Sequence, residues 1–307
     1  MLENEAEFVA AFSDLMSGHR QRAAESLKSL YVRTADAQLK VKIVDALLSA
    51  LDHLKNIDFL STLCDEAAKN ADAIGRPGMR AYFMASKAEL LSCRLIFVHH
   101  ELSCLKMAPC WLEFSTEADR DRHRALTEES DKISAECQRV IEGALSLAER
   151  CGDRKILGRV LMSRGNIWSQ DYMHKMAEAL LGNRRSGWWL RFGSLRGSAI
   201  GTYVIFGTSI ARKLRDKAAL FVGSYLSAAK IFEEAGDDTS GYAYYNLAND
   251  LRMMYRFGEA TKYLVKASAV AERSGDRKLM SLIEILRKSI SSKNRDVPDY
   301  INGELRE

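Results

Sequence analysis

The chain has 307 residues with a formal net charge of +4, and only three of its residues are proline. It is long enough to bury a large apolar surface, and its abundant Ala, Leu, Lys, Arg and Glu residues favour helices over sheets. We therefore predict an all-α protein and exclude a sheet-based architecture.

Three features bear on the compartment. The acidic start, Met1-Leu2-Glu3-Asn4-Glu5, lacks the basic and apolar parts of a signal peptide. Six cysteines lie in the first half of the chain at irregular spacings, which fits reduced thiols better than a disulfide framework. The longest uncharged stretch, 197–211, is 15 residues, short of the roughly 20 that a spanning helix needs. We expect a cytoplasmic protein with no membrane span.

Charge is unevenly distributed. Residues 150–230 contain 15 Lys and Arg against four Asp and Glu, whereas acids outnumber bases in the rest of the chain. A basic middle of this kind attracts nucleic acid, acidic proteins or anionic lipid, but it can equally be matched to acidic neighbours in the same chain.

The predicted helices begin with weakly patterned pairs. Apolar residues recur at helical spacing at Phe8, Phe12, Leu15 and Ala24, then at Val44, Leu48, Leu51 and Leu60, then at Met84, Ala88 and Leu91. Two overgrown helices follow, over about 78–106 and 116–150, and together they form a long pair at about 78–151. Ser115 and Thr116 can cap the second of these helices.

The region 152–291 contains the best repeats. The phrase at 148–155 returns at 271–278 with one change, and turn glycines stand at 152, 193, 236 and 275. Steps of about 40 residues are typical of stacked helical pairs. A last helix over 277–291 presents polar residues that would cap the stack, and residues 293–307 form a flexible tail.

Three units in this region share fixed offsets. Each has a large residue, a small residue four later, an apolar residue three further on, and an alanine twelve after the small one. The units are Leu161, Gly165, Trp168 and Ala177; Tyr203, Gly207, Ile210 and Ala219; and Tyr244, Ala248, Leu251 and Ala260. We interpret the small residue as the close crossing of two helices and the alanine as part of the second helix.

The last unit resembles the tetratricopeptide repeat (TPR) family, in Tyr244, Leu247, Ala248 and Leu251 followed by Ala260, Leu264 and Ala267. The spacing of about 40 residues between successive units resembles that of the family's extended members. The resemblance implies an α-solenoid of antiparallel helical pairs, a right-handed TPR-like superhelix, which would span 1–292 as a single domain.

The resemblance also implies a partner-binding groove on the first helices of the pairs. The position after the small residue, where the family commonly carries an asparagine that binds a peptide, is occupied by Asn166, Thr208 and Asn249. Residues expected on the same face are Arg159, Arg252, Tyr242 and Tyr245. The alternative is that the asparagines are ordinary exposed residues.

Two further patterns bear on binding chemistry. Basic and aromatic residues interleave at Arg184, Arg185, Trp188, Trp189, Arg191 and Arg196, as in proteins that bind single-stranded nucleic acid, although such tryptophans also pack between helices. Cys93, His100 and Cys104 share one helical face, with His99 and Cys110 nearby. The spacing of these cysteines fits core residues better, so we expect no metal or other cofactor.

Recognisable catalytic motifs are missing from the sequence, which lacks a Walker loop, a GxSxG elbow and an HExxH pair. We therefore expect a non-catalytic adaptor or scaffold in a multiprotein complex, which binds a partner peptide or helix in the solenoid groove. The alternatives are a subunit of a nucleoprotein complex that uses the basic 150–230 region, and a regulator that responds to a peptide or small ligand.

Overall fold

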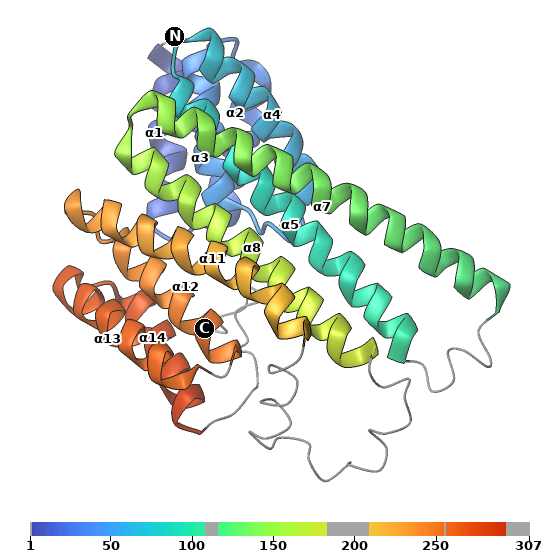
Figure 1. The fold of residues 1–307 in the computed structure, drawn as a ribbon. Helices are drawn as coiled ribbons and strands as arrows, with labels where there is room; N and C mark the ends of the chain where they lie inside the picture. The colour runs from blue at the N-terminus through green and yellow to red at the C-terminus, as the bar shows by residue number, and fades with distance from the viewer. Residues whose placement is uncertain (1, 108–115, 183–208, 255, 293–307) are drawn as a thin grey trace. The chain divides into compact units, whose positions relative to one another are not determined.

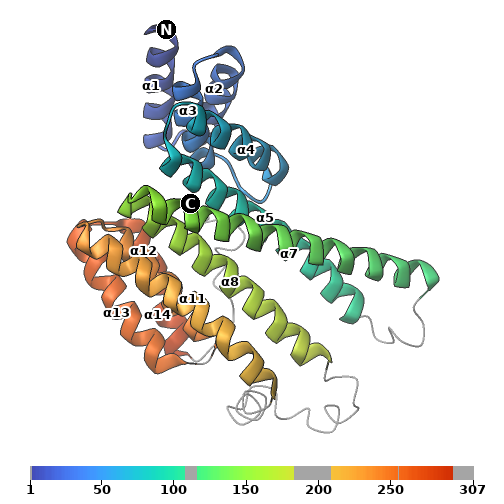
Figure 2. The same ribbon diagram turned by 45° about the horizontal axis from the view of Figure 1, so that its top comes forward.

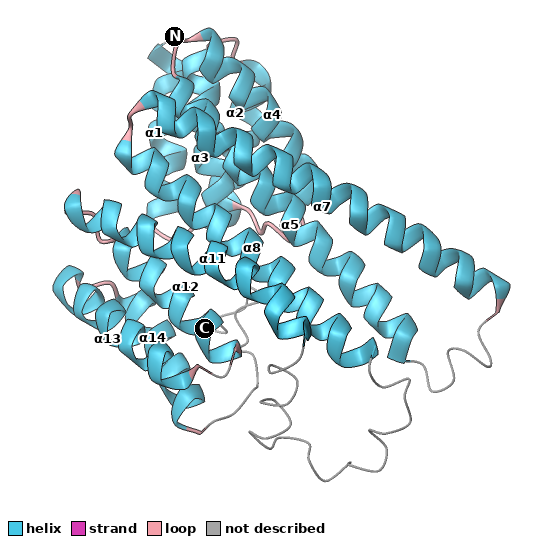
Figure 3. Ribbon diagram, in the orientation of Figure 1, coloured by secondary structure: helices cyan, strands magenta, loops and turns pink. Residues whose placement is uncertain are grey.

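The computed structural model describes residues 2–107, 116–182, 209–254 and 256–292, and within these ranges it is built of helices without strands (Figures 1 and 3). The helices are α1 (Leu2–Met16), α2 (Arg20–Arg33), α3 (Ala37–Ala50), α4 (Ile57–Ala73), α5 (Pro77–Met107), α7 (Glu117–Cys151), α8 (Arg154–Gly182), α11 (Ser209–Glu234), α12 (Thr239–Met253), α13 (Phe257–Ser274) and α14 (Arg277–Ser291). Consecutive helices pack on one another, which confirms the all-α prediction and is compatible with a helical repeat.

The chain divides into two compact units. The N-terminal unit contains Met1–Phe97 and Glu129–Ser163, and the C-terminal unit contains Val98–Glu128 and Arg164–Ile301. The divisions fall inside the long helices α5, α7 and α8. Figure 2 gives a second view of the helices within each unit.

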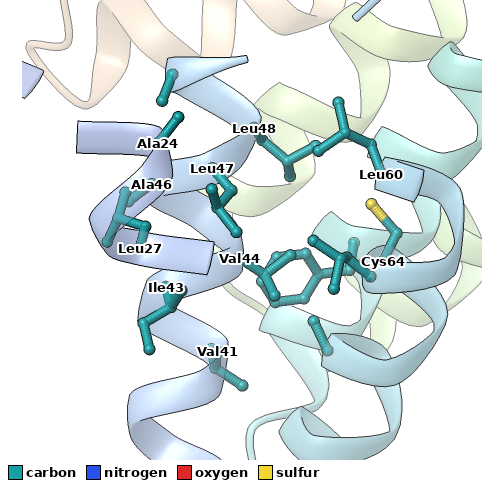
Figure 4. Packing of buried hydrophobic residues seen from close by; sticks show 14 of the residues in the cluster. Ala24, Leu27, Val41, Ile43, Val44, Ala46, Leu47, Leu48, Leu60 and Cys64 are labelled. Carbon is teal, nitrogen blue, oxygen red and sulfur yellow. The ribbon is translucent and has the colours of Figure 1, made fainter. Parts of the chain in front are cut away.

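The core of the N-terminal unit surrounds α3. This helix packs against α1, α2 and α4, and it buries residues on most of its circumference, including Ile43, Val44 and Leu47. An apolar character on all sides is expected of a helix enclosed by neighbours. In Figure 4 these side chains meet Leu27 from α2 and Leu60 from α4.

In the C-terminal unit α12 is the central helix. It packs against α11, α13 and α14 (Figure 1). Ala243, Leu247 and Ala248 on this helix are fully buried. Gly241 permits the close approach, because a Cβ atom there would lie 2.7 Å from the Leu279 side chain on α14.

Several predicted boundaries are confirmed. Gly152, Gly236 and Gly275 adopt positive φ angles of 70°, 64° and 69° at the ends of helices, a conformation that favours glycine. The overgrown helices are α5 and α7, and the Thr116 hydroxyl caps α7 by accepting the Asp119 N–H at 3.1 Å. The last helix has the bounds that we predicted. Gly193 and the tail lie outside the described residues.

The repeat register is correct for one unit and wrong for two. In the correct unit, Tyr244, Ala248 and Leu251 lie on α12 and Ala260 lies on α13. The predicted turn between Trp168 and Ala177 does not exist, because both lie on α8. Ile210 and Ala219 likewise share α11, while Tyr203 and Gly207 lie outside the described residues. Neither interval contains a glycine or proline to end the helix, so each helix continues.

Among the described residues, none of the helices combines the length and the apolar character that crossing a membrane requires.

Candidate functional site

A shallow, open groove lies between α2 and α4. Its volume is about 290 Å³. The lining residues come from one face of each helix: Lys28, Tyr31 and Val32 from α2, and Phe59, Thr62, Leu63 and Glu66 from α4. The positions on α4 are spaced by three or four residues, which places their side chains along a single helical face.

The groove is apolar at its centre. Leu63 is buried and forms the floor, whereas Phe59 is exposed and Val32 is 83% exposed. Large apolar side chains that remain open to water beside a hollow are typical of binding surfaces.

Aromatic and charged groups form the rim. The Lys28 ammonium lies 5.1 Å from the centre of the Phe59 ring, and the Lys40 ammonium lies 5.1 Å from the centre of the Tyr31 ring. The Tyr31 hydroxyl donates a hydrogen bond to Glu66. Burial raises the pKa of this hydroxyl, and the bond to the carboxylate raises it further, so Tyr31 stays protonated and holds Glu66 in place.

The charges of the rim are unbalanced. Among the described residues, neither Lys28 nor Lys40 has a carboxylate within ion-pair distance, whereas Glu66 is engaged by Tyr31. The groove therefore offers an apolar surface with one lining cation, Lys28, and a second cation, Lys40, lies against the ring of Tyr31.

The predicted asparagine sites lie in a different place, a polar cluster between α8, α11 and α12. The Asn166 carbonyl oxygen accepts hydrogen bonds from the Tyr225 hydroxyl at 2.8 Å and from the Asn246 amide at 3.2 Å. Gly165 allows this contact, because a Cβ atom there would lie 2.7 Å from the Tyr225 ring. Asn166 is thus engaged by neighbouring helices of its own unit.

Asp250 belongs to the same cluster. Its Oδ2 atom is buried and has no hydrogen-bond partner among the described residues. Desolvation raises the pKa of Asp250 to about 7, against the hydrogen bonds of Ser169 and Tyr225, which lower it. Burial therefore favours the protonated form of Asp250 up to about pH 7.

The other predicted groove residues are spread over both units. Arg252 on α12 is 2% exposed and donates to the Ser289 hydroxyl at 2.9 Å and to the Asn249 carbonyl oxygen at 3.4 Å. Tyr242 donates to Asp276 at 2.9 Å, and Tyr245 is buried. Arg159 lies 5.5 Å from the centre of the Tyr82 ring in the N-terminal unit. Thr208 lies outside the described residues.

The predicted polyanion contacts, Arg184, Arg185, Trp188, Trp189, Arg191 and Arg196, also lie outside the described residues. Near them in sequence, the buried Asp171 forms ion pairs with Lys175, at 3.1 Å, and with Lys217. Burial lowers the pKa of Lys217, and the bond to Asp171 opposes this. Part of the basic segment is therefore neutralised within the C-terminal unit.

Those residues considered for metal binding that the structure describes are not gathered into a site. Within the described part of the chain, no three His, Cys, Asp or Glu side chains lie close enough to hold an ion. His99 stacks on His174, with ring centres 3.1 Å apart, and Cys93 is half-buried, which raises its pKa to about 11. Cys110 and the side chain of Cys104 lie outside the part of the chain that the structure describes.

Sequence reasoning missed the α2–α4 groove and the partners of Asn166. The groove had a weak signal, because Phe59 precedes the core residue Leu60 and so stands at the edge of the buried face. The polar cluster had a stronger signal in the sequence. Asn246 and Asp250 are four residues apart on one helix, and the residues next to them, Leu247 and Leu251, are buried.

The chain matches no known protein-family model, and no curated protein is similar enough to match it.

Proposed function

We propose that this chain is a non-catalytic, TPR-like helical-repeat scaffold, and that it binds a segment of a partner protein in the groove between α2 and α4. The observation that carries the proposal is the hollow of about 290 Å³ with exposed Val32 and Phe59 at its surface. Helical-repeat proteins commonly bind through surfaces of this kind, and burial of exposed apolar side chains supplies the affinity.

The rim suggests the chemistry of the partner segment. A large apolar side chain would lie on Leu63 between Val32 and Phe59. A carboxylate beside it would meet Lys28 and Lys40, because these ammonium groups lie over the aromatic walls of the groove. An acidic amphipathic peptide or helix is therefore the favoured ligand.

The test is a quantitative pull-down of the full chain and of Val32→Glu, Phe59→Ala and Lys28→Glu variants, read by mass spectrometry. Because these side chains are at least partly exposed, the variants keep their thermal stability but lose the partner. A matched control is Val265→Glu, since Val265 is a similarly exposed valine on α13, remote in sequence from the groove. A partner retained by all three groove variants would contradict the proposal.

The nucleic-acid and ligand-sensing alternatives remain predictions. A nucleoprotein subunit would bind RNA or DNA with an affinity that falls steeply as salt rises. Two cations of the basic segment, Lys175 and Lys217, form ion pairs with Asp171. Their charges are therefore less available to phosphates, which favours the scaffold over this alternative. A sensor would gain thermal stability on adding its ligand.

A further inference from the structure

The outer face of α1 carries an exposed apolar stripe. Val9 is 65%, Phe12 43% and Met16 74% exposed, whereas Ala11 on the opposite face is buried. The three side chains follow one another by three and four residues, which is the spacing of a helix–helix seam. Ala6, Ala10 and Ser13 beside them are also exposed, and their small size would let a second helix approach closely.

The two ends of the stripe have opposite charge. Glu3 and Glu5 stand exposed in the first turn of α1. His19 and Arg20 stand exposed just beyond its last turn, where the His19 N–H bonds the Asp14 carbonyl at 2.9 Å and so holds the start of α2 against the end of α1. Among the described residues, Glu5 and Arg20 have no ion-pair partner, in contrast to Asp14 and Arg22, which pair with each other.

We propose that this face binds a second copy of the chain, with the two α1 helices antiparallel about a two-fold axis near Phe12. In that arrangement Val9 lies opposite Met16 of the other copy, and Glu5 lies opposite its Arg20. A surface that is negative at one end and positive at the other is complementary to itself only when antiparallel, and a closed two-fold pair results. A parallel pairing would place Glu5 against Glu5.

The surface is separate from the α2–α4 groove, so dimerisation and partner binding can be tested independently. The first measurement is sedimentation equilibrium of the full chain from low to high micromolar concentration. A reversible monomer–dimer equilibrium is expected. A chain that stays monomeric throughout would overturn the proposal and leave the stripe to a different protein.

Charge reversal then tests the orientation. Glu5→Arg and Arg20→Glu each place like charges together twice in the homodimer, so each variant should dimerise at least about tenfold more weakly. An equimolar mixture should restore the dimer, because the two substituted positions then face each other with opposite charges, while the native Glu5 and Arg20 meet at the second contact. Failure of the mixture to recover would rule out the antiparallel pairing.

The design separates association from folding. At helix N-termini the dipole favours acidic residues, so Arg20→Glu should slightly stabilise the monomer and Glu5→Arg slightly destabilise it. Both should nevertheless weaken the dimer. Met16→Glu should abolish the dimer, whereas Val265→Glu, at another exposed apolar site on α13, should preserve it. Equal dimerisation of Met16→Glu and the wild-type chain would show that the stripe is not the interface.

Discussion

The groove between α2 and α4 and the polar cluster around Asn166 are both built from facing helical surfaces, but they differ in what occupies the space between the helices. In the cluster, side chains of α11 and α12 already engage Asn166. In the groove, Val32 and Phe59 remain exposed above Leu63. A residue at a binding position of a repeat is therefore available to a partner only if the neighbouring helices leave its side chain exposed.

A substitution at Gly165 should destabilise the protein most, because it disrupts the packing of the polar cluster. Gly165→Leu would drive a side chain into the Tyr225 ring, where even a Cβ atom would lie at 2.7 Å, and it should cost about 3 kcal/mol of unfolding free energy. Gly223→Ala on α11 is the matched control, because nothing lies within 4 Å of its Cβ position. That control should stabilise the protein by about 0.5 to 1 kcal/mol through helix propensity. Urea unfolding of both variants checks the pair, and a neutral Gly165→Leu would refute the packing of α8 on α11.

The next effect is a pH dependence. Because the pKa of Asp250 is raised from 3.8 to about 7, the folded state binds this proton more tightly than the unfolded state. The resulting stabilisation is complete below the unfolded value and is lost as the pH rises through about 7. Asp250→Asn should therefore stabilise the protein above neutral pH, and much less near pH 4.

Thermal or urea unfolding across this pH range measures the effect as the difference between variant and wild type. Asp131→Asn, at an exposed position of α7, serves as the control and should give no such difference. An Asp250→Asn variant whose advantage is the same at all pH values would show that Asp250 is ionised throughout.

Alanine substitutions at the two predicted asparagines should have weaker effects on stability, and the two effects should differ. Asn166→Ala removes the acceptor of two hydrogen bonds and should cost about 1 to 2 kcal/mol. Asn249→Ala removes a longer bond to Arg252 and should cost about 0.5 kcal/mol. Unfolding free energies compare the two variants directly. If Asn166→Ala left stability unchanged while weakening partner binding, the peptide-groove interpretation of Asn166 would be favoured.

The sequence was informative where local chemistry decides the structure. Turn glycines such as Gly275, the cap at Thr116 and the bounds of α14 follow from rules that act over a few residues. The register failed at Trp168 and Ala177, because a repeat spacing does not reveal that a helix continues through an expected turn.

The site was harder to predict because exposure depends on neighbouring helices. Val32 and Leu63 are ordinary apolar residues in the sequence, and only the packing of α2 beside α4 leaves one exposed and the other as a floor. Asn166 was predicted to occupy a binding position of the repeat, but its partners Tyr225 and Asn246 lie about 60 and 80 residues further along the chain.

We propose that a partner segment binds over Val32 and not over the predicted asparagine position Asn249. The most direct measurement places a photo-crosslinking amino acid at Val32 in one full-length variant and at Asn249 in another, and identifies the adducts by mass spectrometry. We expect a specific adduct at Val32, with an acidic segment that contains a large apolar residue, and no adduct at Asn249. Crosslinking at Asn249 without crosslinking at Val32 would show that the partner does not bind in the α2–α4 groove.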